Sequence, residues 1–169
     1  MTLVQADILA RRCVDHAKAI LLRYGRHGFH ATVLMPDGRL GMVDASDVVS
    51  KAEAAWTAGD ADAIMALRFA VADKLREVCT RVSADGIVCV MEGWLAGWCG
   101  ETSPESARRA VCVTWEFRIS DPVVHPCSSG SVLSGLCELE YARGEGGVVR
   151  ILSEHSHEPA FGAFSGIVR

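Results

Sequence analysis

The sequence lacks a hydrophobic run long enough to cross a membrane. Its longest near-continuous apolar stretch, Ile87 to Met91 continuing into Trp94-Leu95-Ala96, is far shorter than the roughly 20 residues that a span requires. The first residues, Met1 to Tyr24, alternate charged and apolar residues at helical spacing and contain no basic patch followed by an apolar block. We therefore expect neither a transmembrane segment nor a signal peptide, and we expect a cytoplasmic protein with no membrane partner.

The motifs of several common chemistries are also missing. There is no G-x-S-x-G, and Gly144-Glu145-Gly146-Gly147 precedes an expected strand, whereas a phosphate-binding loop opens a helix. The seven cysteines are odd in number and contain no C-x-x-C pair, so they are read as reduced thiols and not as a disulfide framework. A formal net charge of −4 without interleaved basic and aromatic residues argues against direct nucleic-acid binding.

The chain is nevertheless rich in apolar residues. Half of its 169 residues are hydrophobic and only 22% are charged, and the mean hydropathy is +0.21. This length suits one domain with one substantial core, so residues 1–169 are expected to form a single domain. Because so much apolar surface requires burial, part of it is expected to lie between subunits of a homo-oligomer, and a homodimer is the simplest case.

Hydrophobic periodicity predicts an α+β fold. Apolar residues recur every three or four positions in the helical segments and every second position in the strands. Turn residues such as Pro36-Asp37-Gly38 and Gly144–Gly147 separate the strands. The expected helices are Leu3–Tyr24, Ala45–Ala58 and a longer one beginning after Asp60, and the expected strands are His30–Met35, Leu40–Asp44, Ile87–Met91, Ala110–Ile119, Ser131–Ala142 and Val148–His155. They form one mostly antiparallel sheet of about five to six strands, packed by the N-terminal helix and by a central helix or helix pair.

Two histidine-containing pairs suggest a metal site. His125 and Cys127 are spaced i, i+2, as are His155 and His157, and in an extended segment such pairs project to one face. Four nitrogen and sulfur ligands of this kind suit zinc. The alternative is that these side chains are solvated and bind no metal.

Glu92 is the candidate general base. It follows the apolar segment Ile87–Met91 and stands beside a glycine and Trp94, where a carboxylate near an aromatic wall can have a raised pKa. The alternative is a strand-terminating glutamate that accepts backbone hydrogen bonds or pairs with Arg108 or Arg109. The further acidic residues at alternating strand positions, Glu116, Glu138 and Glu140, are expected on a solvated sheet face.

Trp94 and Trp98 lie four residues apart and suggest a ligand-binding wall, with Arg108 and Arg109 as further ligand-binding candidates. The alternative is that the two tryptophan side chains are buried in the core.

The run Val88-Cys89-Val90-Met91-Glu92-Gly93-Trp94, followed by Ser103-Pro104-Glu105-Ser106-Ala107-Arg108-Arg109-Ala110, resembles short uncharacterised bacterial and phage proteins. In those proteins a hydrophobic strand ends in Glu-Ala-Trp and a Pro/Arg segment follows; here Gly93 replaces the alanine. The likeness covers about 30 residues. The order helix, hairpin, helices and sheet is similar to that of profilin-like and roadblock domains, which are mainly interaction modules.

Three functional hypotheses follow. The first is a small intracellular protein-protein interaction module without a cofactor, encoded by a phage or another mobile element. The second is a metal-dependent hydrolase-like enzyme that uses zinc and Glu92. The third is a sensor for a small ligand bound near Trp94 and Trp98.

Overall fold

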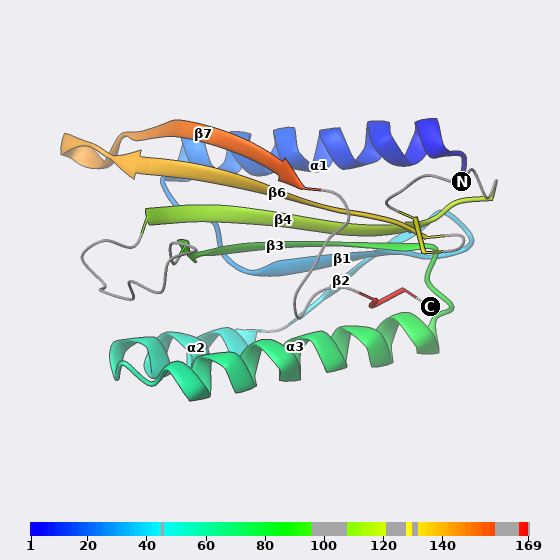
Figure 1. The fold of residues 1–169 in the computed structure, drawn as a ribbon, viewed down its shortest axis with the longest axis horizontal. Coiled ribbons are helices and arrows are strands. Elements are labelled where there is room, and N and C mark those ends of the chain that lie inside the picture. Colours follow the sequence, from blue (N-terminus) through cyan, green and yellow to red (C-terminus); the bar gives the residue numbers. More distant parts are fainter. Residues whose placement is uncertain (45, 96–107, 121–127, 130–131, 158–165, 169) are drawn as a thin grey trace.

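The computed structural model describes residues 1–44, 46–95, 108–120, 128–129, 132–157 and 166–168. Its elements, in chain order, are α1 (Leu3–Tyr24), β1 (His30–Leu34), β2 (Leu40–Val43), α2 (Ser46–Thr57), α3 (Ala61–Arg81), β3 (Gly86–Leu95), β4 (Arg108–Arg118), β5 (Ser128–Ser129), β6 (Val132–Arg143), the short 3-10 turn η1 (Glu145–Gly147) and β7 (Val149–His157) (Figure 1). The prediction of an α+β fold with a mostly antiparallel sheet is confirmed.

Helix α1 begins and ends where its sequence predicts. The Thr2 side chain accepts a hydrogen bond from the Gln5 N–H, and the Gln5 side chain accepts one from the Thr2 N–H, which forms a capping box. At the other end Gly25 has φ of 71° and donates its N–H to the Leu21 carbonyl. A residue without Cβ adopts this left-handed conformation at little cost, so Gly25 stops the helix.

Every pair of neighbouring strands is antiparallel. The order across the sheet is β2-β1-β3-β4-β6-β5, and β7 pairs with a different stretch of β6 from the one that β5 uses. The two-residue β5 makes seven strands in all, one more than the predicted upper number. Strand β3 is also longer than predicted, because it continues from Met91 to Leu95 in an unbroken register with β4.

Helix α1 covers one face of the sheet over β4, β6 and β7 (Figure 1). Its buried stripe is formed by small residues and one leucine, which lets the helix approach the strands closely. It packs on alternate strand residues that include Val111, Val113 and Leu139, each of them fully buried. This is the first of two hydrophobic clusters.

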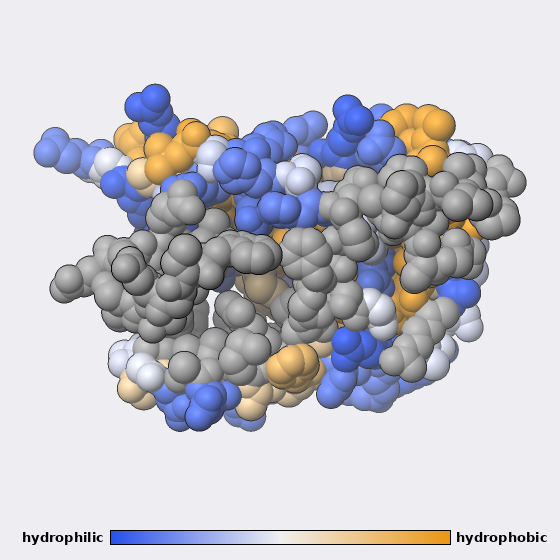
Figure 2. All heavy atoms as spheres, viewed as in Figure 1, coloured by the Kyte–Doolittle hydropathy of each residue, from blue (hydrophilic) through white to orange (hydrophobic). Residues whose placement is uncertain are grey.

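The helix pair α2 and α3 lies on the opposite side of the sheet (Figure 1). Val71, Leu75 and Cys79 of α3 pack with Ala31 and Val33 of β1 and with Ile87 and Cys89 of β3 in the second cluster. Ile167 and Val168, near the end of the chain, are buried in the same cluster. On the face shown in Figure 2, hydrophobic atoms reach the surface in separate patches among hydrophilic ones. None of the helices in the described residues is long and apolar enough to span a membrane.

Candidate functional site

Glu92 lies inside β3 and not after it, which corrects the predicted strand end. Its Cα is paired with that of Val111 on β4, and the register continues for three more residues. Because side chains alternate along a strand, Glu92 shares a face with Val88 and Val90, which pack in the α1 cluster. The carboxylate therefore lies on the α1 face of the sheet.

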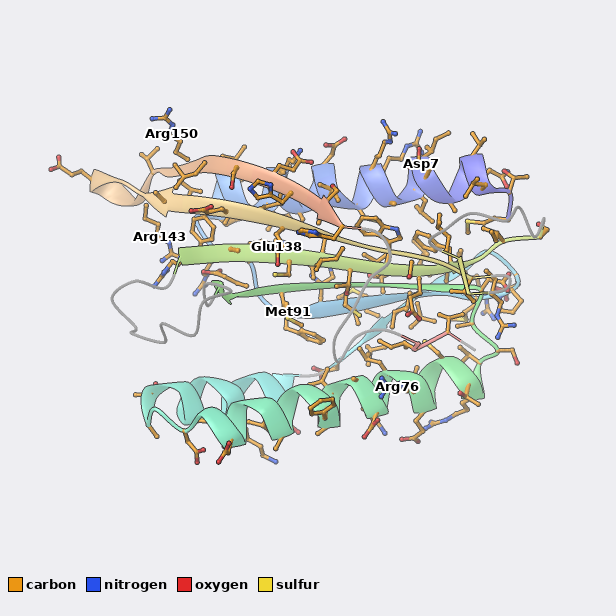
Figure 3. The ribbon with its side chains drawn as sticks, in the orientation of Figure 1. Asp7, Arg76, Met91, Glu138, Arg143 and Arg150 are labelled. Atoms are coloured by element: carbon orange, nitrogen blue, oxygen red, sulfur yellow. The ribbon has the colours of Figure 1, made fainter. Side chains whose placement is uncertain are left out.

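Four groups surround this carboxylate. It accepts the His27 backbone N–H at 2.8 Å and the Tyr141 hydroxyl. Arg143 Nη2 lies 3.2 Å from Oε1, and Arg109 Nη1 lies 3.8 Å from the same atom. Figure 3 shows Arg143 at the end of β6, beside the start of β4. We call Glu92, Tyr141, Arg109, Arg143 and the His27 N–H the Glu92 cluster.

Within the Glu92 cluster, the Glu92 carboxylate is a hydrogen-bond acceptor. The Glu92 side chain is 22% exposed, so these contacts lie in a partly dry environment where charge-assisted hydrogen bonds are strong. Burial of Tyr141 and its hydrogen bond to Glu92 raise the pKa of the phenol. Tyr141, Arg143 and Arg109 contact Oε1, and the His27 N–H donates to Oε2. The geometry thus matches the alternative interpretation, a glutamate that accepts a backbone hydrogen bond and pairs with Arg109.

Sequence reasoning missed Tyr141 and Arg143, although a signal was present. Tyr141 lies at the end of the predicted strand Ser131–Ala142, and Arg143 directly follows that strand. Because β6 continues to Arg143, the i, i+2 spacing places both residues on one face of the sheet. A tyrosine and an arginine on the face that also carries Glu92 are natural partners for a half-buried carboxylate.

Two histidines lie beside the cluster. The His27 ring is stacked on His30 with 5.1 Å between centroids. His27 Nδ1 lies 2.9 Å from the Gly28 carbonyl, which can only accept, so Nδ1 carries the proton. His27 is 4% exposed, and its Nε2 is buried without a hydrogen-bond partner in the part of the chain that the structure describes. Burial lowers the pKa of both imidazoles.

The structure describes only part of the predicted ligand-binding residues. Trp94 is the Cα partner of Arg109, and Leu95 is the partner of Arg108, so Trp94 lies at the same end of the sheet as Glu92. The side chains of Trp94 and Arg108, and all of Trp98, lie outside what the structure describes.

Only half of the predicted metal ligands fall within the described residues. His155 and His157 lie on β7, opposite Glu138 and Leu136 of β6, and their i, i+2 spacing puts both on one face as predicted. His157 Nε2 lies 3.4 Å from Glu138 Oε2. His125 and Cys127 lie outside the described residues. Among the residues described, no three potential ligands lie close enough together to hold a metal ion, and the zinc site stays a prediction.

The expectation of a solvated acidic sheet face is wrong for Glu116 and Glu140. Glu116 is 2% exposed, and its carboxylate accepts hydrogen bonds from three consecutive backbone N–H groups. The Gly166 N–H donates to Oε1. The Ile167 and Val168 N–H groups donate to Oε2, both at 2.7 Å. Glu140 is also buried and accepts the Ser153 hydroxyl at 3.0 Å. The last described residues fold back over this face and supply the donors, which strand alternation alone does not reveal.

No family model matches the chain, and neither the curated proteins nor the solved structures contain a significant match.

Proposed function

We propose that this protein is an interaction module that binds protein through the open edge of its sheet at β2. The observation that carries the proposal is the exposure of two large apolar side chains on that short strand: Leu40 is 68% exposed and Met42 is 80% exposed. Exposed apolar residues on an edge strand promote pairing with another chain, and many interaction domains bind partners in this way.

The backbone of β2 is oriented for such pairing. Among the described residues β2 pairs only with β1. The Met35 N–H donates to the Arg39 carbonyl at 2.9 Å, next to the hairpin turn. In an antiparallel pair the hydrogen-bonded positions alternate, so Gly41 and Val43 bond to β1 while the N–H and C=O groups of Leu40 and Met42 point to the open edge.

The partner that best fits this edge is a second copy of the chain. If two β2 strands pair antiparallel about Gly41, Leu40 of one copy lies opposite Met42 of the other, and each apolar side chain gains an apolar neighbour. The two Gly41 residues then face each other in a non-hydrogen-bonded pair, where strands approach most closely and a missing side chain avoids a clash.

Analytical ultracentrifugation over a concentration series tests the proposal. We expect a mass approaching twice the 18.1 kDa of the chain as concentration rises, and a monomer for Leu40→Lys/Met42→Lys, because edge lysines block strand pairing. The matched control is Val148→Lys/Leu152→Lys, which charges two other exposed apolar residues at 69% and 54% exposure near the far edge of the sheet. A wild-type chain that stays monomeric, or a β2 variant that dimerises like the control, would refute the proposal.

We also propose that the module acts in the cytoplasm. The five described cysteines are free thiols, and such thiols persist in a reducing compartment. The contacts that hold Glu92 against Tyr141, Arg143 and the His27 N–H suit a structural glutamate, and this favours the interaction module over the hydrolase-like enzyme.

A further inference from the structure

Met42 of β2 has the most exposed sulfur-containing side chain in the part of the chain that the structure describes. The residue is 80% exposed. Its Cα partner on β1 is Thr32, whose own partner on β3 is Val88 of the α1 cluster, so Met42 lies on the α1 side of the sheet. Helix α1 covers that side over β4, β6 and β7, whereas β2 lies at the other end of the strand order. Met42 therefore stands on an open margin of the sheet.

The other methionines whose side chains the structure describes, Met1, Met35 and Met91, are partly buried. Met1 packs against the α1 cluster. A Cβ at Gly41 would lie 2.9 Å from Met35 Cε, so Met35 lies against Gly41 on the side of β2 opposite Met42. Met91, labelled in Figure 3, points from β3 toward α2 and α3. An oxidant that arrives from solvent meets Met42 before these three.

Four of the five described thiols compete poorly for such an oxidant. Peroxides react with the thiolate, so a raised pKa slows the oxidation of a thiol at neutral pH. Burial raises the pKa of Cys79 to about 11 and the pKa of Cys89 to about 12. Burial also raises the pKa of Cys13 and of Cys137. A thioether has no proton to lose, so the oxidation of Met42 needs only access to its sulfur.

We propose that Met42 is a modification site, and that its oxidation by a peroxide opens the paired β2 edge. A lone pair of the sulfur attacks one peroxide oxygen, the O–O bond breaks, and the proton of the transferred oxygen passes to the departing hydroxide. The sulfur is oxidised by two electrons to the sulfoxide, and the peroxide is reduced to water. The inference rests on the proposed β2 pairing, in which Met42 of one copy lies opposite Leu40 of the other. The polar sulfoxide then faces an apolar side chain.

Oxidation and pairing are coupled in both directions. If the sulfoxide weakens the dimer, the dimer must protect Met42 from oxidation, because a coupling free energy between two events is reciprocal. A symmetric dimer contains the contact between Met42 and Leu40 twice, so each oxidised chain affects both copies. We expect the dissociation constant of the dimer to rise about tenfold on full oxidation of Met42. A methionine sulfoxide reductase reverses the modification and should restore pairing.

The probe is dilute hydrogen peroxide acting on the full chain. Peptide mapping by mass spectrometry measures the sulfoxide at each methionine, and analytical ultracentrifugation measures the dissociation constant before and after treatment. We expect Met42 to oxidise several-fold faster than Met35 and Met91 when the protein is dilute and monomeric. Its oxidation should slow at concentrations where the chain is dimeric, and reductase treatment should return the original dissociation constant.

The matched control is Met42→Leu, which keeps an apolar side chain of similar volume and removes the sulfur. It should dimerise like the wild type, and peroxide should leave its dissociation constant unchanged, whereas Met35→Leu should keep the full response. The inference fails if Met42 oxidises no faster than Met91, if the oxidised chain dimerises like the untreated one, or if Met42→Leu responds to peroxide as the wild type does. A wild-type chain that stays monomeric overturns the β2 pairing and with it the proposed effect of oxidation, and the relative oxidation rates of Met42 and Met91 in that monomer decide the modification site separately.

Discussion

Replacing Glu116 by glutamine should destabilise the protein strongly, although the two side chains have the same shape. The carboxylate offers only acceptors to the three N–H groups of Gly166, Ile167 and Val168. A glutamine keeps one oxygen and turns an NH₂ group toward at least one of those donors. One buried hydrogen bond is then lost, and the remaining ones change from charge-assisted to neutral.

The magnitude follows from the burial of the site. Hydrogen bonds to a charged group contribute roughly 1.5–3 kcal/mol each, and a buried unsatisfied donor costs about 1–3 kcal/mol. We expect a loss of about 3 kcal/mol in the free energy of unfolding, which lowers the melting temperature by roughly 6–12 °C for a chain of this size. Urea unfolding followed by circular dichroism measures this loss directly.

A matched substitution and a local probe sharpen the test. Glu138→Gln alters a half-buried glutamate on neighbouring β6 that contacts His157, and it should cost less than about 1 kcal/mol. Hydrogen exchange at the Ile167 and Val168 amides should accelerate in Glu116→Gln while the amides of β4 stay protected. If Glu116→Gln unfolds within about 0.5 kcal/mol of the wild type, the inferred role of the carboxylate is wrong.

Three further perturbations test other parts of the structure. Stability should fall as the pH drops from 7 to 5.5, because the unfolded chain protonates His27 and His30 near pH 6.5 while their folded pKa values are lowered by burial, with a slope of up to about 1.4 kcal/mol per pH unit for each histidine. His27→Gln should flatten this pH dependence in urea titrations and exposed His155→Gln should not; equal slopes in both variants would contradict the argument. Gly135→Ala should cost about 1–3 kcal/mol because its Cβ collides with Trp115, whereas Gly28→Ala, where no atom lies within 4 Å, should be nearly neutral in thermal melts. Tyr141→Phe should cost about 1–2 kcal/mol in urea unfolding through the lost hydrogen bond to Glu92, and exposed Tyr24→Phe serves as its control; equal losses in the two would show that the bond to Glu92 is not the cause.

The sequence predicted the local elements well because their signals are local. Thr2, Gln5 and Gly25 mark the ends of α1, and the Pro36-Asp37-Gly38 turn marks the first hairpin. The end of β3 was missed because Gly93 interrupts the apolar pattern, and only the register with β4 reveals that the strand continues. Strand alternation correctly placed His155 and His157 on one face.

The candidate site was harder to predict because its partners come from distant parts of the chain. Glu92 receives donors from the segment after α1 and from the end of β6. Glu116 receives its donors from an irregular segment some 50 residues later. Such contacts depend on strand order and on chain reversals, and neither has a signature in residue spacing. The position of Glu92 after an apolar run therefore marked it as a candidate, but the sequence did not predict which groups surround it.

The placement of α1 has a consequence for how the protein is made. This helix is synthesised before the strands on which it packs, because β4, β6 and β7 span residues 108–157. At a synthesis rate of roughly 5–20 residues per second, its apolar stripe waits on the order of ten seconds for a partner surface. The nascent chain thus exposes this stripe until β4, β6 and β7 have emerged, and during that interval the chain is at its most susceptible to misassembly with neighbouring copies of itself.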